Sequence, residues 1–319
     1  AVTAIVFHAT YRIGSRSLKN KFLWFVAIAA FLAIFVLKLP FPLIVLSAGI
    51  AGYLTSKKYP ELFSSAAGHK SSQKDYGPAF IDDDTPTPEH AKFHWSRLAK
   101  LIFVAIALWL LPILALGAYF GWHHSYTQMA WFFTKAALLT FGGAYAVLPY
   151  VYQGAVNHFG WLSPTQMIDG LALGETTPGP LIMVVAFVGF LGGVNHSLLG
   201  SEHLFFAGAL GAVIVTWFTF LFSFVFIFAG APIIESTHNE IKFTAPLTAI
   251  TAAVVGVILN LALFFSYHVL WPQGFSGHFD IVAALITVAA FIALFRFNVN
   301  VLYVIFASAL VGLAVTFFS

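Results

Sequence analysis

Long apolar runs constrain the fold of this chain more than any other feature of its sequence. The longest cover residues 98–120, 203–231, 243–265 and 299–318. Each approaches the about 20 residues that an α-helix needs to cross the hydrocarbon core of a bilayer. The whole chain is 60% hydrophobic and 8% charged, whereas a soluble domain has about 25% charged residues. The runs therefore predict an all-α, polytopic membrane protein.

Several classes of chemistry are excluded by composition. The chain has no cysteine, which rules out disulfides and thiolate metal sites. Its net charge of +3 is not a signal for nucleic acid, because the basic residues follow membrane topology. No zinc-protease histidine pair, phosphate-binding loop or nucleophile elbow is present. We therefore expect no enzyme, cofactor or metal, and any active transport must use an existing gradient or the ATPase of another subunit.

Two further apolar stretches are interrupted by residues that break helices. The stretch 127–150 contains Gly142-Gly143, and the stretch 165–194 contains Thr177-Pro-Gly-Pro180. Unpaired peptide groups at membrane depth are tolerated only where protein buries them or where they line a cavity. We therefore predict discontinuous helices that meet at a binding site. The alternatives are a close-packing point at the glycine pair and a simple kink at the prolines.

Helix starts at these breaks are suited to an anion, since each exposes unpaired N–H groups and the positive end of the helix dipole. Two starts aimed at one point would hold a small tetrahedral oxyanion. The predicted substrate-binding residues are Phe141, Gly142, Gly143, Ala144 and Tyr145 at the first break, and Thr176, Thr177, Pro178, Gly179 and Pro180 at the second. The threonine hydroxyls are expected to add donors.

Three charged residues lie near the breaks. Lys135, the only Lys or Arg between residues 100 and 242, is a candidate for binding the anion, or it extends to the membrane interface. Glu175 abuts the second break and is a candidate to carry a coupling proton. Its alternative roles are a helix-end cap and an ion-pair partner of Lys135. Asp169 is a second candidate, although its position next to a polar loop favours an interfacial role.

An internal repeat is indicated by two matches in the same order. Ala1–Val6 resembles Ala249–Val254, and Phe31–Phe35 resembles Phe291–Phe295. Low-complexity apolar sequence gives chance matches, so the shared order is the stronger evidence. We interpret residues 1–54 as the C-terminal tail of a first repeat, 55–97 as a polar cytoplasmic linker and 98–319 as a complete second repeat. The front of the first repeat is expected to be missing.

Basic residues indicate that the two copies have opposite orientations. The loop after the first match contains Arg12, Arg16, Lys19 and Lys21, whereas residues 261–279 contain no Lys or Arg. By the positive-inside rule, the first loop is cytoplasmic and the second is external. Opposite orientation is typical of an inverted-topology transporter repeat. In the linker, Asp82–Asp84 with His90 and His94 could hold a cation, but we expect a solvated acidic loop.

At these motifs the chain resembles the chromate ion transporter (CHR) family. The resemblance rests on Phe141-Gly-Gly-Ala-Tyr-Ala, Gly160-Trp-Leu, Asp169-Gly-Leu-Ala-Leu-Gly, Thr177-Pro-Gly-Pro-Leu and Phe187-Val-Gly-Phe. It implies a duplicated, multi-pass protein of the cytoplasmic (inner) membrane that exports chromate, with sulfate as a mimic. The long, two-repeat form of the family fits best.

Partners expected on this basis are the oxyanion, the lipid bilayer and a second copy in a homodimer, but not nucleic acid. Two alternatives stay open. One is a carrier for sulfate or another anion. The other, from a different class, is a non-transporting membrane subunit or a membrane enzyme.

Topology can be tested with single cysteines introduced at Ser71 and Ser276, because the chain has none of its own. We expect Ser71→Cys to be labelled from the cytoplasmic side and Ser276→Cys from the external side by an impermeant thiol reagent. Labelling of both from the same side would contradict the inverted arrangement.

Overall fold

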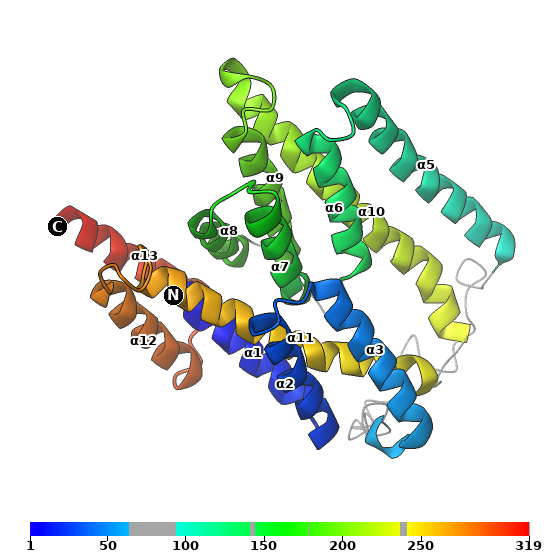
Figure 1. Cartoon of the computed structure of the whole chain (residues 1–319), viewed down its shortest axis with the longest axis horizontal. Coiled ribbons are helices and arrows are strands. Elements are labelled where there is room, and N and C mark those ends of the chain that lie inside the picture. The colour runs from blue at the N-terminus through cyan, green and yellow to red at the C-terminus, as the bar shows by residue number, and fades with distance from the viewer. Residues whose placement is uncertain (64–93, 141–143, 178, 237–240, 319) are drawn as a thin grey trace, which may run out of the picture.

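The computed structural model describes residues 1–63, 94–140, 144–177, 179–236 and 241–318. Within these ranges the regular elements are helices and there is no strand (Figure 1). The predicted all-α fold class is confirmed.

In chain order, the elements are α1 (Val2–Ser17), α2 (Lys21–Phe35), α3 (Phe41–Lys58), α5 (Trp95–Phe120), α6 (Ser125–Leu138), α7 (Ala144–Tyr152), the π-helix η1 (Gln153–His158), α8 (Pro164–Thr176), the 3-10 turn η2 (Leu181–Met183), α9 (Val184–Asn195), the 3-10 turn η3 (Ser201–His203), α10 (Leu204–Ser236), α11 (Ile241–Leu270), α12 (Ile281–Phe295) and α13 (Val301–Phe318).

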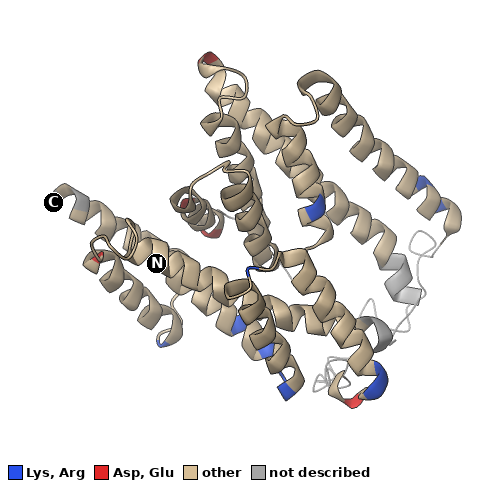
Figure 2. Cartoon of the chain, viewed as in Figure 1, with Lys and Arg blue, Asp and Glu red and all other residues tan. Residues whose placement is uncertain are grey.

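Two groups of helices make up the molecule (Figure 1). The scaffold comprises α1–α3 and α11–α13, in which α11 packs against α1, α2 and α3. The bundle comprises α5–α10, in which α10 packs against α5, α6 and α9. The two groups meet where α7 contacts α11 and where α8 contacts α1, α11 and α13. Figure 2 shows Lys and Arg gathered along α1 and at the outer ends of α2 and α3, while the bundle carries few charges.

Three helices in the described part of the chain are long and apolar enough to cross a membrane. These are Trp95–Phe120, Ser201–Gly230 and Thr244–Leu270, with mean hydropathies of 2.6, 2.4 and 2.3. Only 11% of the window in α5 is buried, against 61% of the window in α11. We conclude that α11 is the central helix of the scaffold, whereas the described residues leave most of the apolar surface of α5 uncovered.

Polar groups inside the bundle are satisfied by hydrogen bonds between helices, as a low-dielectric environment requires. The Tyr126 hydroxyl donates to the Ala207 carbonyl at 2.8 Å, which joins α6 to α10. The Trp109 indole N–H donates to the Thr134 hydroxyl at 3.0 Å. These bonds fix α5 and α6 against the rest of the bundle.

Small residues allow the main crossings to be close. A Cβ added to Gly256 of α11 would collide with the carbonyl oxygen of Ala27 in α2. In the bundle, a Cβ added to Gly193 of α9 would collide with the Ala207 carbonyl oxygen of α10. Without a hydrophobic driving force between helices in lipid, such close backbone packing supplies much of the association energy.

Helices α2 and α3 form a first hairpin, and α12 and α13 form a second. The bounds of α2 and α12 are separated by 260 residues, and so are the starts of α3 and α13. Asn20 caps α2 by accepting from Leu23 N–H, and Asp280 caps α12 by accepting from Ala283 N–H. The turn residue is left-handed in both, with φ 52° at Lys38 and 50° at Asn298.

Each hairpin packs mainly on a helix from the other end of the chain. Ala253 of α11 lies in the groove between α2 and α3, and Ile5 of α1 packs with Ala290 and Val304 of the second hairpin. The grooves, of about 350 and 480 Å³, are lined by corresponding alanines. This reciprocal packing is what two related copies would produce, while the predicted repeat boundaries and inverted orientation stay predictions.

The crossing of α11 and α2 can be tested with Gly256→Ala. We expect it to lower the free energy of unfolding by about 1–3 kcal/mol, since the added methyl overpacks a close helix contact. The measurement is the thermal unfolding midpoint in detergent. Gly230→Ala is the matched control, because a Cβ there meets no atom within 4 Å. Equal midpoints for the two variants would contradict the close crossing.

Candidate functional site: two broken helices

The second predicted break is present between α8 and α9. α8 begins with a capping box in which Ser163 and Gln166 exchange side chain-to-backbone hydrogen bonds. It ends at Thr176, and Thr177 is already extended, with φ −80° and ψ 126°. Gly179 follows with φ +150°, and the chain re-enters a helix through η2. The predicted discontinuity is confirmed, and the new helix begins with the 3-10 turn η2, which follows Pro180. Pro178 lies outside the described residues.

The first break separates α6 from α7. α6 ends at Leu138 and α7 begins at Ala144. The candidates Phe141, Gly142 and Gly143 lie outside the described residues. The apolar stretch 127–150 therefore consists of two shorter helices, as predicted, and Ala144 and Tyr145 occupy the first turn of the second one.

A side-chain hydrogen bond joins the two breaks. The hydroxyl of Tyr145, in the first turn of α7, donates to Oε1 of Glu175, one residue before the end of α8. Both side chains are half-buried, and η2 contacts both α7 and α8. The start of α7, the end of α8 and the start of the η2–α9 segment therefore converge. From sequence, Tyr145 was a candidate through its backbone amide alone, and the role of its hydroxyl was not predicted.

The threonine hydroxyls at the second break point back into their own helix. Thr176 Oγ1 donates to the Leu173 carbonyl at 3.0 Å, and Thr177 Oγ1 donates to the same carbonyl at 2.7 Å. The same carbonyl also accepts the backbone N–H of Thr177 at 3.0 Å, so it receives three hydrogen bonds at the end of α8. Each hydroxyl proton is used in its bond to the Leu173 carbonyl. Either threonine can therefore donate to a ligand only after its hydroxyl rotates away from that carbonyl.

Lys135 and Asp169 are placed away from the Tyr145–Glu175 pair. The ammonium of Lys135 lies 6.0 Å from the ring centroid of Trp131, and both side chains are exposed on α6. Asp169 is exposed on α8, six residues before Glu175 and on a different face of that helix. The described contacts bring neither residue to the point where the helices converge.

Arg12 of α1 lies near the site, although from sequence it was a candidate for topology only. Its guanidinium lies within electrostatic range of the Tyr145 phenol, and α1 contacts α8. The available signal was the spacing of His8, Arg12 and Arg16, which places three basic side chains on one face of a helix.

Gln153, at the start of the π-helix η1, joins the bundle to the scaffold by a hydrogen bond. Its side-chain oxygen accepts a hydrogen bond of 3.3 Å from the N–H of Phe41 at the start of α3. The rings of Phe41 and Tyr150 lie 6.0 Å apart. Because Pro40 provides no side-chain cap for α3, Gln153 supplies that partner from the other group of helices.

Metal binding has no support among the described side chains, where no group of three or more His, Asp or Glu could hold an ion. The acidic linker residues Asp82–Asp84 and His90 lie outside the described residues.

Comparison with known proteins identifies matches in sequence but not in structure. The profile of a family described as "Chromate transporter" matches residues 127–313. A chromate transport protein of Pseudomonas aeruginosa is 29% identical over 317 residues, which cover 98% of this chain and 64% of that protein. A chromate transport protein of Cupriavidus metallidurans is 30% identical over 137 residues, or 43% of this chain and 31% of that protein.

A probable chromate transport protein of Synechococcus elongatus is 30% identical over 131 residues, which cover 41% of this chain and 30% of that protein. The chain thus spans less than two thirds of the length of these relatives. No solved structure matches the chain.

The hydrogen bond between the breaks can be tested with Tyr145→Phe. We expect the free energy of unfolding to fall by about 1–3 kcal/mol, because a half-buried carboxylate loses its donor. The measurement is thermal unfolding in detergent, with Tyr119→Phe as the control, since Tyr119 is 83% exposed. If Tyr145→Phe is no less stable than Tyr119→Phe, the bond does not hold the two breaks together.

Proposed function

Because this chain belongs to the chromate transporter family, we propose that it carries chromate or a similar tetrahedral oxyanion across the cytoplasmic membrane. The helical, multi-pass architecture and the naming of the relatives as transport proteins support this proposal. The proposed reaction is secondary transport, in the direction of export, and not an enzymatic conversion.

One observation carries the proposed site: the hydrogen bond from Tyr145 to Glu175 holds the two broken helices at one point. The first turns of α7 and of η2–α9 each begin with N–H groups that lack intrahelical acceptors. The dipoles of these two starts favour an anion, whereas the C-terminal end of α8 contributes potential of the opposite sign. We propose that the oxyanion binds there, against the amides of Ala144, Tyr145, Leu181 and Ile182.

The charge of Glu175 would couple binding of the anion to binding of a proton at this site. Two unit charges about 4 Å apart interact by about 4 kcal/mol at an effective dielectric constant near 20. An ionised Glu175 would therefore strongly oppose a dianion beside it. Protonation removes the repulsion, and the Tyr145 hydroxyl can then accept a hydrogen bond from the acid instead of donating one. We propose that Glu175 is the proton-coupling group.

The larger organisation that we propose is a pair of inverted repeats, with residues 1–54 belonging to the first and 98–319 to the second. The matching hairpins and their reciprocal packing support it. In such transporters the substrate site lies at the interface between repeats and the two groups of helices move against each other. In this chain, α8 is the element of the site that touches α1, α11 and α13.

Coupling is tested with Glu175→Gln in vesicles that contain the purified protein, by chromate and sulfate flux at several pH values. Glutamine keeps the shape and an acceptor for Tyr145 but cannot ionise. We expect flux to continue and to lose its pH dependence. A pH profile identical to that of the unaltered protein would exclude Glu175 as the coupling group.

The anion position is tested with Gly179→Leu, compared with Gly200→Leu. Both glycines have positive φ, +150° and +88°, and both have open space around a Cβ, so the two variants impose similar backbone strain. Only Gly179 adjoins the proposed anion. We expect about tenfold or greater loss of flux for Gly179→Leu alone, the size of effect that losing about 1.4 kcal/mol of binding produces. Equal flux in the two variants would contradict binding at the break.

A further inference from the structure

We propose that α1 carries an anion path, a row of basic side chains that leads the transported oxyanion from a polar cavity at the end of α1 to the Tyr145–Glu175 pair. The row consists of His8, Arg12 and Arg16, with Lys19 just beyond the helix. This inference rests on the proposed function and assigns these residues a role in binding the substrate.

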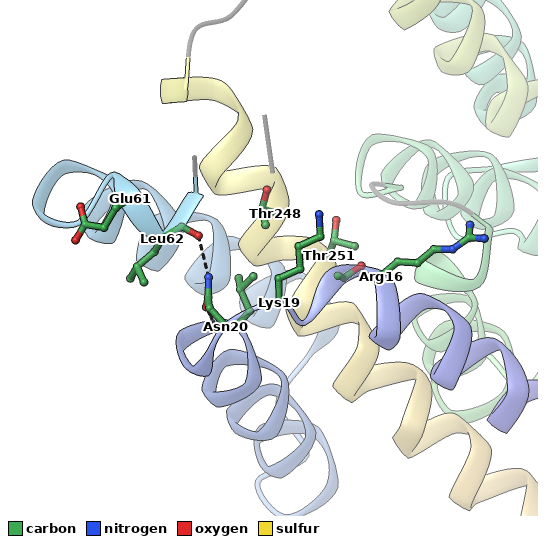
Figure 3. A pocket seen from close by; sticks show the side chains of 9 residues that line it. Arg16, Lys19, Asn20, Glu61, Leu62, Thr248 and Thr251 are labelled. Atoms are coloured by element: carbon green, nitrogen blue, oxygen red, sulfur yellow. Dashed lines mark hydrogen bonds between the residues drawn. The ribbon is translucent and has the colours of Figure 1, made fainter. Parts of the chain in front are cut away.

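The outer end of the path is a cavity of about 300 Å³ where α1 ends and α2 begins (Figure 3). Its walls come from α1, α2, the segment after α3 and the first third of α11. It is lined by Arg16, Ser17, Lys19, Asn20, Leu23, Glu61, Leu62, Thr248 and Thr251. A tetrahedral oxyanion is small compared with this volume.

Charged donors in the cavity come from the basic residues. The hydroxyls of Thr248 and Thr251 donate to carbonyls of their own helix, each at 2.8 Å. The Asn20 amide donates to the Leu62 carbonyl at 2.8 Å. Lys19 points toward Thr251 (Figure 3). Glu61 lies on the opposite side of the cavity, and its carboxylate points away from Lys19 and Thr251. An anion entering the cavity therefore meets Lys19, whereas the guanidinium of Arg16 extends away from Lys19 and Thr251 (Figure 3).

The inner part of the path follows from helical spacing. Residues four apart lie on one face of a helix, and each step of four advances about 6 Å along the axis. Arg12 thus lies about 6 Å from the cavity residue Arg16 along the axis of α1, in the direction of the bundle. It is within electrostatic range of both His8 and Tyr145.

α1 contacts α12 of the scaffold and α8 of the bundle. His8 packs edge-on against Phe295 with ring centroids 5.2 Å apart, and Tyr11 packs against the same ring at 5.5 Å. α1 also contacts α8, whose end carries Glu175. The path is therefore built where the scaffold meets the bundle, and it ends at the proposed anion site.

Topology alone is the competing explanation, because basic residues accumulate on cytoplasmic loops in any membrane protein. Lys57 is an example of a basic residue whose position is explained by topology alone. It is exposed at the end of α3, its ammonium lies 4.6 Å from the ring centroid of Tyr53, and it does not line the cavity. A purely topological charge can be neutralised without changing the apparent affinity for substrate.

The experiment compares Arg12→Gln, Arg16→Gln and Lys57→Gln in vesicles containing the purified full chain, by the KM for chromate and for sulfate. We expect KM to rise about tenfold for the two arginine variants, the effect of losing one charged contact to the anion, and to stay unchanged for Lys57→Gln. Equal KM values for Arg12→Gln and Lys57→Gln would overturn the inference.

Misfolding is separated from loss of charge with Arg12→Cys, which introduces the only cysteine in the chain. After reconstitution, a cationic thiol reagent should restore the low KM and a neutral reagent of the same size should not. Equal effects of the two reagents would overturn the path, because the charge would then be irrelevant.

Two other outcomes are also decisive. An Arg16→Gln effect that appears only in vesicles with anionic lipid would assign the cavity to a lipid headgroup and overturn the path. Absence of flux in the unaltered chain would overturn the proposed function itself, and the path with it.

Discussion

A helix that is interrupted inside a membrane leaves peptide groups that lipid cannot satisfy, and the rest of this structure follows from how that cost is met. The interruptions after α6 and after α8 are brought together, with Tyr145 from one donating a hydrogen bond to Glu175 from the other. Under the proposed function, the helix starts that would otherwise be a penalty supply N–H groups and positive potential to a bound anion.

The scaffold supports the broken helices through α8. α11 is its central helix, and the reciprocal packing of the two hairpins on α11 and α1 gives it two similar halves. α8 rests on α1, α11 and α13, so the broken helices lie against the boundary between those halves. The close glycine crossings at Gly256 and Gly193 lie within the scaffold and within the bundle, respectively.

Much of the fold could be predicted because its signals are local. The apolar runs, the prolines and the glycine pair act on the residues next to them. The matched segments Phe31–Phe35 and Phe291–Phe295 fall at the ends of α2 and α12, which are corresponding helices in the structure. The partner of Glu175 could not be predicted in the same way, because Tyr145 is 30 residues away and sequence spacing does not say which side chains meet. Lys135 illustrates the same limit, since its distance from the break did not reveal that it shares an exposed face with Trp131. Arg12 was assigned to topology because the positive-inside rule accounts for its charge without reference to what it faces.

The central claim is that the two broken helices hold the oxyanion, and the most direct measurement is a structure of the protein with a heavy-atom oxyanion such as selenate or tungstate, located by its anomalous scattering. The account predicts a peak within hydrogen-bonding distance of the amides at the start of α7 and at Leu181 and Ile182. A well-occupied peak elsewhere in the protein, with none at the breaks, would contradict it.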